Sequence, residues 1–232
     1  MKILMLSCTF PYPPSRGGTP IRTFNLMRYL SQRHSVTVVT QRAADVTDEE
    51  IEALRQYVDK LVVFPRPRED QSQRDMAGKL KRFGQFLIEG TPPSVMSIYS
   101  SQMQQWIDQA VESGAYDAIT CEHSVNEIYV RPEWQQQLTT VVDVHSSVYA
   151  TCKEQLATGT AEKPLRDRLN RPLLYRYEQR YCNKFSVIVA TTEEDGEQLK
   201  SFYTAAELAV IPYGVELELF HYWVESADGH QL

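Results

Sequence analysis

The feature that most constrains this chain is the regular alternation of short apolar segments with longer segments of helical periodicity. Seven short segments rich in Val, Ile and Leu predict buried strands at residues 2–7, 35–40, 60–64, 116–121, 139–144, 186–190 and 208–211. Apolar residues at helical spacing predict helices between most of them, at residues 19–30, 47–57, 73–88, 97–113, 166–184 and 193–202. Strands that alternate with helices are typical of parallel βαβ units. We therefore predict an α/β, three-layer, Rossmann-like domain around a roughly seven-stranded parallel sheet.

The length of the chain, 232 residues, allows one large α/β domain or two small ones. We expect residues 1–220 to form one domain. Residues 221–232 follow the last apolar segment with a polar composition, which is typical of a linker between domains.

Composition excludes several classes of protein. The chain is 42% hydrophobic and 23% charged, as in ordinary soluble proteins, and its net charge of −6 argues against a nucleic-acid binder. The cysteines form no C-x-x-C pair and no zinc-ligand spacing, so we expect reduced thiols; they are Cys8, Cys121, Cys152 and Cys182. We see no signal peptide and no segment as long as a membrane span. A cytoplasmic protein is expected.

The first candidate site is the loop between the first strand and the first helix. Gly17 and Gly18 precede a helix for which Thr19 is the expected N-cap, and backbone N–H groups at such a place can bind an anion. Arg16 and Arg22 flank the loop and could hold phosphate. The alternative is that the two glycines only make a tight turn. The loop is not the dinucleotide fingerprint G-x-G-x-x-G.

Two further candidate sites follow the fourth and fifth predicted strands. Glu122 and His123 could take a proton from a sugar hydroxyl or stabilise developing positive charge, or they could be a turn cap and a surface histidine. The segment Asp143–Ser147, which includes His145 and Ser146, lies at the end of the fifth predicted strand and is expected to line the same cleft. There the alternative is a helix cap at Ser146 or Ser147.

A basic segment precedes an apolar one in the third predicted helix. Arg74, Lys79, Lys81 and Arg82 are followed by Phe83 and other apolar residues. This pattern is compatible with peripheral contact to the inner face of an anionic membrane, and also with a helix that has one solvated and one packed face.

Together these segments resemble the N-terminal domain of group 1 (family 4) glycosyltransferases, which have the GT-B fold. The resemblance covers essentially the whole chain. It rests on the first strand with its glycine loop, on residues 116–123, on residues 185–195, and on residues 210–220. The last segment, VIPYGVELELF, is similar to the family pattern viPNGVD…F, with Tyr213 in place of Asn and Glu216 in place of Asp. The family's second, donor-binding domain has no counterpart in this sequence.

The resemblance implies transfer of a sugar from a nucleotide-sugar to an acceptor hydroxyl, with retention of configuration. No cofactor and no metal are expected, since the nucleotide-sugar is a substrate. The acceptor, which could be a glycan, a lipid-linked molecule or a small molecule, is not specified. The partners implied are these two substrates and a C-terminal donor domain, without which we expect the chain to be inactive.

The resemblance also implies roles for individual residues. Glu122 or His123 stands at the family's catalytic position. The donor phosphates would be bound by Gly17, Gly18 and Arg16, and the cleft would be lined by Arg22, His145, Ser146, Tyr213 and Gly214.

Two alternatives belong to other classes. The first is a stand-alone binding or partner subunit that completes a donor-binding domain on a separate chain. The second is a Rossmann-type oxidoreductase or epimerase, against which the sequence argues because it has neither G-x-G-x-x-G nor a Tyr-x-x-x-Lys pair.

Overall fold

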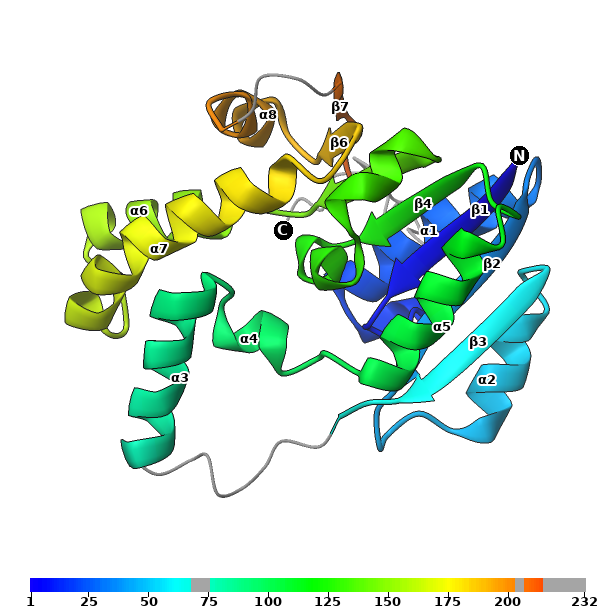
Figure 1. Ribbon diagram of the computed structural model, residues 1–232, viewed down its shortest axis with the longest axis horizontal. Helices are drawn as coiled ribbons and strands as arrows, with labels where there is room; N and C mark the ends of the chain where they lie inside the picture. The colour runs from blue at the N-terminus through cyan, green and yellow to red at the C-terminus, as the bar shows by residue number, and fades with distance from the viewer. Residues whose placement is uncertain (68–75, 203–206, 215–232) are drawn as a thin grey trace, which may run out of the picture.

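The computed structural model describes residues 1–67, 76–202 and 207–214 (Figure 1). The expected linker at residues 221–232 lies outside these ranges. Arg74 also lies outside them, and the side chains of Lys79, Lys81 and Arg82 are not described. The membrane-contact helix, and the cytoplasmic location with it, therefore stay predictions.

Seven parallel strands form one sheet in the part of the chain that the structure describes. Their order is β3-β2-β1-β4-β5-β6-β7, and every neighbouring pair is parallel. The strands are β1 (Lys2–Ser7), β2 (Ser35–Arg42), β3 (Lys60–Pro65), β4 (Ala118–Glu122), β5 (Thr139–Val144), β6 (Val187–Ala190) and β7 (Glu207–Val210). The predicted fold class is confirmed.

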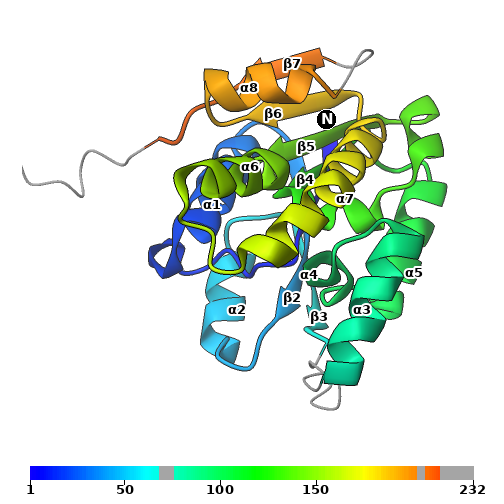
Figure 2. The ribbon, with the colours of Figure 1, turned by 90° about the vertical axis from the view of Figure 1, so that its left-hand side faces the viewer.

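Helices cover both faces of the sheet (Figure 2). They are α1 (Gly18–Ser31), α2 (Asp48–Arg55), α3 (Met76–Glu89), α4 (Pro93–Met96), α5 (Ser101–Glu112), α6 (Val148–Thr158), α7 (Pro164–Cys182) and α8 (Glu193–Lys200). Short 3-10 helices η1 (Pro14–Arg16), η3 (Ser124–Tyr129) and η4 (Pro132–Gln136) lie in the loops.

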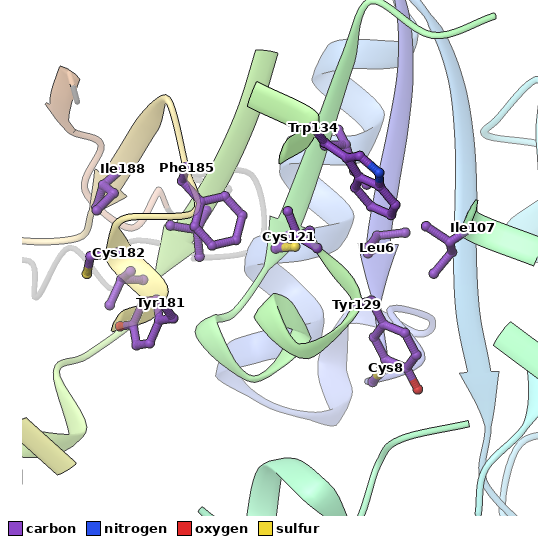
Figure 3. Close-up of a cluster of buried hydrophobic side chains, with 14 of the residues drawn as sticks. Leu6, Cys8, Ile107, Cys121, Tyr129, Trp134, Tyr181, Cys182, Phe185 and Ile188 are labelled. Carbon is purple, nitrogen blue, oxygen red and sulfur yellow. The ribbon is translucent and has the colours of Figure 1, made fainter. Parts of the chain in front are cut away.

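Alternate side chains of β1 point to opposite faces of the sheet and pack into two separate layers of the core. Ile3 and Met5 pack with side chains of α1 and α2. Leu4 and Leu6 pack on the opposite face with α5, η3 and α7, where Tyr129, Trp134 and Phe185 fill the space (Figure 3). Buried strands of this kind are apolar on both faces, because helices cover both.

Several element boundaries differ from the sequence prediction. The helix expected at residues 97–113 begins at Ser101, because the Ser100 side chain caps it and the Ser100 N–H bonds to Tyr129. The N-cap of α1 is Gly17 and not Thr19. The helix α6 has no buried residue and was not predicted as an element. No helix among the described residues is long and apolar enough to cross a membrane.

The strand order places a topological switch point between β1 and β4. From β1 the chain moves outward to β2 and β3, then returns to the other side of β1 with β4 and continues outward through β7. In open α/β sheets, ligands bind outside the carboxyl ends of the strands at this point. The loops after β1, β4 and β5 all end there, so the fold brings together the segments that carry the candidate residues.

Candidate active site at the carboxyl edge of the sheet

Four segments meet beyond the carboxyl ends of β1, β4 and β5. The His123 and His145 rings, which follow β4 and β5, lie edge to face with centroids 4.9 Å apart. Thr19 Oγ1, in the first turn of α1, is 3.4 Å from His145 Nδ1. The Tyr213 ring, from the segment after β7, is 6.0 Å from the His145 ring. The structure therefore joins candidates that are far apart in the sequence.

A buried ion pair between Arg22 and Asp143 lies beneath these rings. Arg22 donates from Nε to Asp143 Oδ2 at 2.5 Å and from Nη2 to Oδ1 at 2.7 Å, and both side chains are 3% exposed. Its third nitrogen, Nη1, is 3.3 Å from the Pro212 carbonyl, and the guanidinium lies 5.0 Å from the centre of the Tyr213 ring. Arg22 thus connects α1, β5 and the segment that leaves β7.

The sheet register explains why Arg22 meets Asp143. Cys121 and Val142 point into the layer of α5 and α7. Their neighbours Glu122 and Asp143, which pair across β4 and β5, point to the opposite face, the one that α1 covers. A cation on α1 is therefore placed against two buried carboxyl groups.

The two carboxyl groups have opposite protonation tendencies. Burial and the neighbouring Asp143 raise the pKa of Glu122 to about 8, although Thr120 and Arg22 oppose the shift. Burial alone would raise the pKa of Asp143 too, but His145 and Arg22 outweigh it and hold that pKa below its ordinary value. Near neutral pH the site therefore holds a protonated Glu122 beside an ionised Asp143.

Glu122 is closed off from solvent. Only 2% of the residue is exposed, and its Oε1 accepts a hydrogen bond of 2.9 Å from Thr120 in the same strand. Its Oε2 is buried without a hydrogen-bond partner among the described residues. The side chain is placed beneath the edge of the sheet, where an acceptor molecule would not reach it.

His123 takes an unusual backbone conformation at the end of β4. Its φ is 82° and its ψ is 139°, a region that residues other than glycine rarely adopt. Its Nδ1 accepts the N–H of Val125 at 3.3 Å, which leaves the proton on Nε2. Burial, and then the nearby His145, lower the pKa of His123 to about 4. The ring is therefore neutral near pH 7 and presents an Nε2–H donor.

The glycine loop ends at the N-terminus of α1. Gly17 has a φ of 151° and is the N-cap, and no side chain caps the helix. A Cβ on Gly18 would meet no atom within 4 Å, so the approach to this turn is open. Arg16 turns away toward α2, where its Nη2 is 2.7 Å from Glu50 Oε1.

The remaining candidates lie at the margin of the site. Ser146 and Gly214 are exposed. The N-cap of α6 is Ser147, so the helix-cap alternative holds for that residue. Its Oγ donates to Glu178 Oε2 at 2.7 Å and thereby ties the start of α6 to α7.

Asp143 belonged to the segment predicted to line the cleft, but no role in the site was predicted for it or for Thr19. Asp143 could have been found from its place near the end of a buried apolar strand, because a buried carboxylate needs a partner. Thr19 carried only a capping signal. Among the described residues, no group of three His, Cys, Asp or Glu side chains is arranged to hold a metal ion.

A hollow of about 700 Å³ lies at the opposite, amino edge of the sheet. Its carboxylates have structural roles, since Asp117 accepts the Lys2 N–H at 2.7 Å and Asp59 accepts the Val36 N–H at 2.8 Å. We therefore do not place the active site there.

A doubly wound parallel sheet with polar side chains and an uncapped helix at its switch point defines a Rossmann-like ligand-binding domain. Residues 16–219 match the family model described as Glycosyltransferase Family 4. The chain belongs to this family, and its fold is that of the N-terminal domain of a GT-B glycosyltransferase. No curated protein sequence matches it.

Solved structures that are similar to this chain share little sequence with it. UGT2 from Phytolacca americana, complexed with UDP-2-fluoro-glucose and pterostilbene, is 11% identical, with a TM-score of 0.51 over 92% of this chain and 54% of that one. A UDP-glucosyltransferase from Polygonum tinctorium is 12% identical, with a TM-score of 0.49 over 100% of this chain and 55% of that one. Sucrose-phosphate synthase from Thermosynechococcus elongatus is 12% identical, with a TM-score of 0.45 over 94% of this chain and 92% of that one. The chain spans about half the length of the first two.

Proposed function

We propose that this chain is the acceptor-side domain of a retaining glycosyltransferase, which transfers a sugar from a nucleotide-sugar to an acceptor hydroxyl. A donor-binding domain would face the carboxyl edge of the sheet and complete the active site. The observation that carries the proposal is the meeting of the α1 N-terminus, His123 and His145 at the switch point. Family membership supports the transferase activity, and retention rests on the resemblance to group 1 enzymes.

The uncapped start of α1 fits the leaving group of such a reaction. A nucleoside diphosphate gains negative charge as the bond to the sugar breaks. Backbone N–H groups at Gly18 and Thr19, together with the helix dipole, stabilise such charge without a cation. Arg16 would act less directly, because Glu50 already binds its guanidinium.

His123 is the side chain that we assign to substrate contact. Its neutral ring presents Nε2–H at the edge of the sheet, where it can donate a hydrogen bond to a sugar hydroxyl and orient it. The strained backbone supports this role, because strain of this kind gathers at functional sites. Glu122, which is buried below, would act on the site through its charge state and not by contact.

Arg22 and Asp143 are assigned a positioning role. Their ion pair is buried, so neither group reaches a substrate directly. Asp143 Oδ2 lies 3.2 Å from His145 Nε2, a contact without hydrogen-bond geometry, and the His145 ring packs against His123. Arg22 also donates a hydrogen bond to the Pro212 carbonyl. The ion pair therefore connects the site to the segment that is expected to lead into the donor domain.

The experiment is a screen of nucleotide-sugars and acceptors against the protein that includes its donor domain. Release of nucleoside diphosphate reports turnover, and NMR of the product gives its anomeric configuration. We expect a product with the configuration of the donor, and no turnover by residues 1–232 alone. An inverted product would contradict retention, and turnover by the 232-residue chain would contradict the need for a second domain.

A further inference from the structure

The helices α6 and α7 extend beyond the carboxyl edge of the sheet (Figure 1). The buried residues of α7 all lie in its last turns: Tyr177, Glu178, Tyr181 and Cys182. Its earlier turns and the whole of α6 have no fully buried residue. This helical pair is therefore held at one end and leaves a large surface accessible.

The accessible part of α7 carries several exposed arginines. Among the described residues, Arg168, Arg171 and Arg176 have no carboxylate within ion-pair distance, whereas Arg166 of the same helix pairs with Asp167 at 2.8 Å. The chain as a whole is acidic, with a net charge of −6. On an acidic protein, such a group of arginines forms a local region of positive potential that attracts anions.

Two of these arginines line a hollow of about 360 Å³ between α6 and α7. The lining residues are Tyr149, Arg171, Pro172, Tyr175, Arg176 and Gln179. A volume of this size is in the range of small-molecule sites. Arg168 is not part of the lining, although it lies one helical turn before Arg171.

Two of the lining side chains, Tyr149 and Tyr175, belong to a group of packed aromatic rings that also includes Phe202, which is not a lining residue. The Tyr149 and Tyr175 rings lie edge to face with centroids 5.2 Å apart, and Phe202 packs against both, at 5.8 Å and 5.0 Å. Glu178 fixes the two helices together, since its carboxylate accepts from Ser147 Oγ and from the Val148 N–H, each at 2.7 Å. These contacts hold the lining residues in place, which lowers the entropy lost on binding.

The chemistry of the lining selects an anion with several acceptor oxygens. Two guanidinium groups supply a double positive charge and many N–H donors, which suit the charge and the oxygens of a phosphate group. Tyr and Gln side chains add neutral hydrogen-bonding groups. No acidic side chain is among the lining residues to repel the ligand.

We propose that the hollow between α6 and α7 is a binding site for a phosphate-bearing molecule, with Arg171 and Arg176 as its phosphate ligands. The phosphate belongs either to a free phosphorylated compound or to a lipid headgroup. This site is separate from the one at the switch point, and its ligand binding is measured without any transferase reaction.

The first arm of the test measures binding of inorganic phosphate and pyrophosphate to residues 1–232 by calorimetry at constant ionic strength. Arg171→Gln/Arg176→Gln should weaken binding at least about tenfold, because charge-assisted hydrogen bonds are lost. Arg168→Gln removes an equally unpaired cation outside the hollow and should bind as the unchanged chain does. Thermal unfolding of each variant checks that the fold is kept.

The second arm identifies the source of the phosphate. Vesicles of phosphatidic acid with phosphatidylcholine are compared with phosphatidylcholine alone in sedimentation assays. Binding to soluble phosphates that is lost in the double variant assigns the site to a free compound. Binding to phosphatidic acid alone, with the same loss, assigns it to a lipid headgroup. The proposal is overturned if the unchanged chain binds neither probe, or if Arg168→Gln weakens binding as much as the double variant.

Discussion

Arg22 and Asp143, which are 121 positions apart in the sequence, share two hydrogen bonds of 2.5 and 2.7 Å on the buried face between α1 and β5. This pair links the helix that begins the site to the strand that carries His145. It also explains why a carboxylate stays ionised next to the protonated Glu122.

Removal of Arg22 should strongly destabilise the domain. Arg22→Met leaves Asp143 buried without its cation, which should lower the free energy of unfolding by about 3–5 kcal/mol. Arg16→Met breaks a pair between partly exposed side chains and should cost no more than about 1 kcal/mol. Urea unfolding measures both. The double variant Arg22→Met/Asp143→Leu, which removes both charges, should recover much of the lost free energy of unfolding. Equal losses in Arg22→Met and Arg16→Met would contradict a larger contribution of the buried pair to stability.

Glu122 should make stability depend on pH in a defined direction. Burial and Asp143 raise its pKa to about 8, so the folded chain keeps a proton that the unfolded chain releases above the ordinary value of 4.5. The free energy of unfolding attributable to Glu122 therefore falls as pH rises through this window. Glu122→Gln cannot ionise, so its stability relative to the unchanged chain should increase between about pH 5 and about pH 8. A difference between the two proteins that does not vary with pH would refute this assignment.

The glycine loop offers a matched pair of substitutions. Gly17→Ala forces a side chain into a conformation with a φ of 151° and should destabilise the chain by about 1–3 kcal/mol. Gly18→Ala lies in the first turn of α1, where a Cβ meets no atom within 4 Å, and should be neutral or slightly stabilising. Thermal or urea unfolding distinguishes them. The reverse order would show that the turn does not need Gly17.

Most of the fold could be predicted because the buried strands can be recognised in the sequence by their apolar composition. A strand covered on both faces is buried along nearly its whole length and is rich in apolar residues, as β1 and β2 are. The helix predicted at residues 47–57 is confirmed as α2, and a capping box of Thr47 and Glu50 starts it. By contrast, α6 has no buried residue, so its sequence carries no periodic apolar signal.

The site was less predictable because a sequence does not state which side chains meet. The position of Glu122 and His123 at the carboxyl end of β4 could be predicted from the sequence. Which of the two side chains is buried depends on the strand register and on the positive φ of His123. Arg16 stood next to the glycines in sequence, yet Glu50 of α2 binds it. Asp143 is prominent only after α1 is seen to place Arg22 against it.

The central claim is that His123 acts on the substrates of a sugar transfer at the switch point. Its most direct test compares initial rates of transfer from a nucleotide-sugar for the protein with its donor domain, unchanged and as His123→Ala and Glu122→Gln. We predict that His123→Ala lowers the rate by about 100-fold or more with the fold intact, whereas Glu122→Gln stays within about tenfold. A His123→Ala rate equal to that of the unchanged protein, or no transfer from any nucleotide-sugar, would contradict the account.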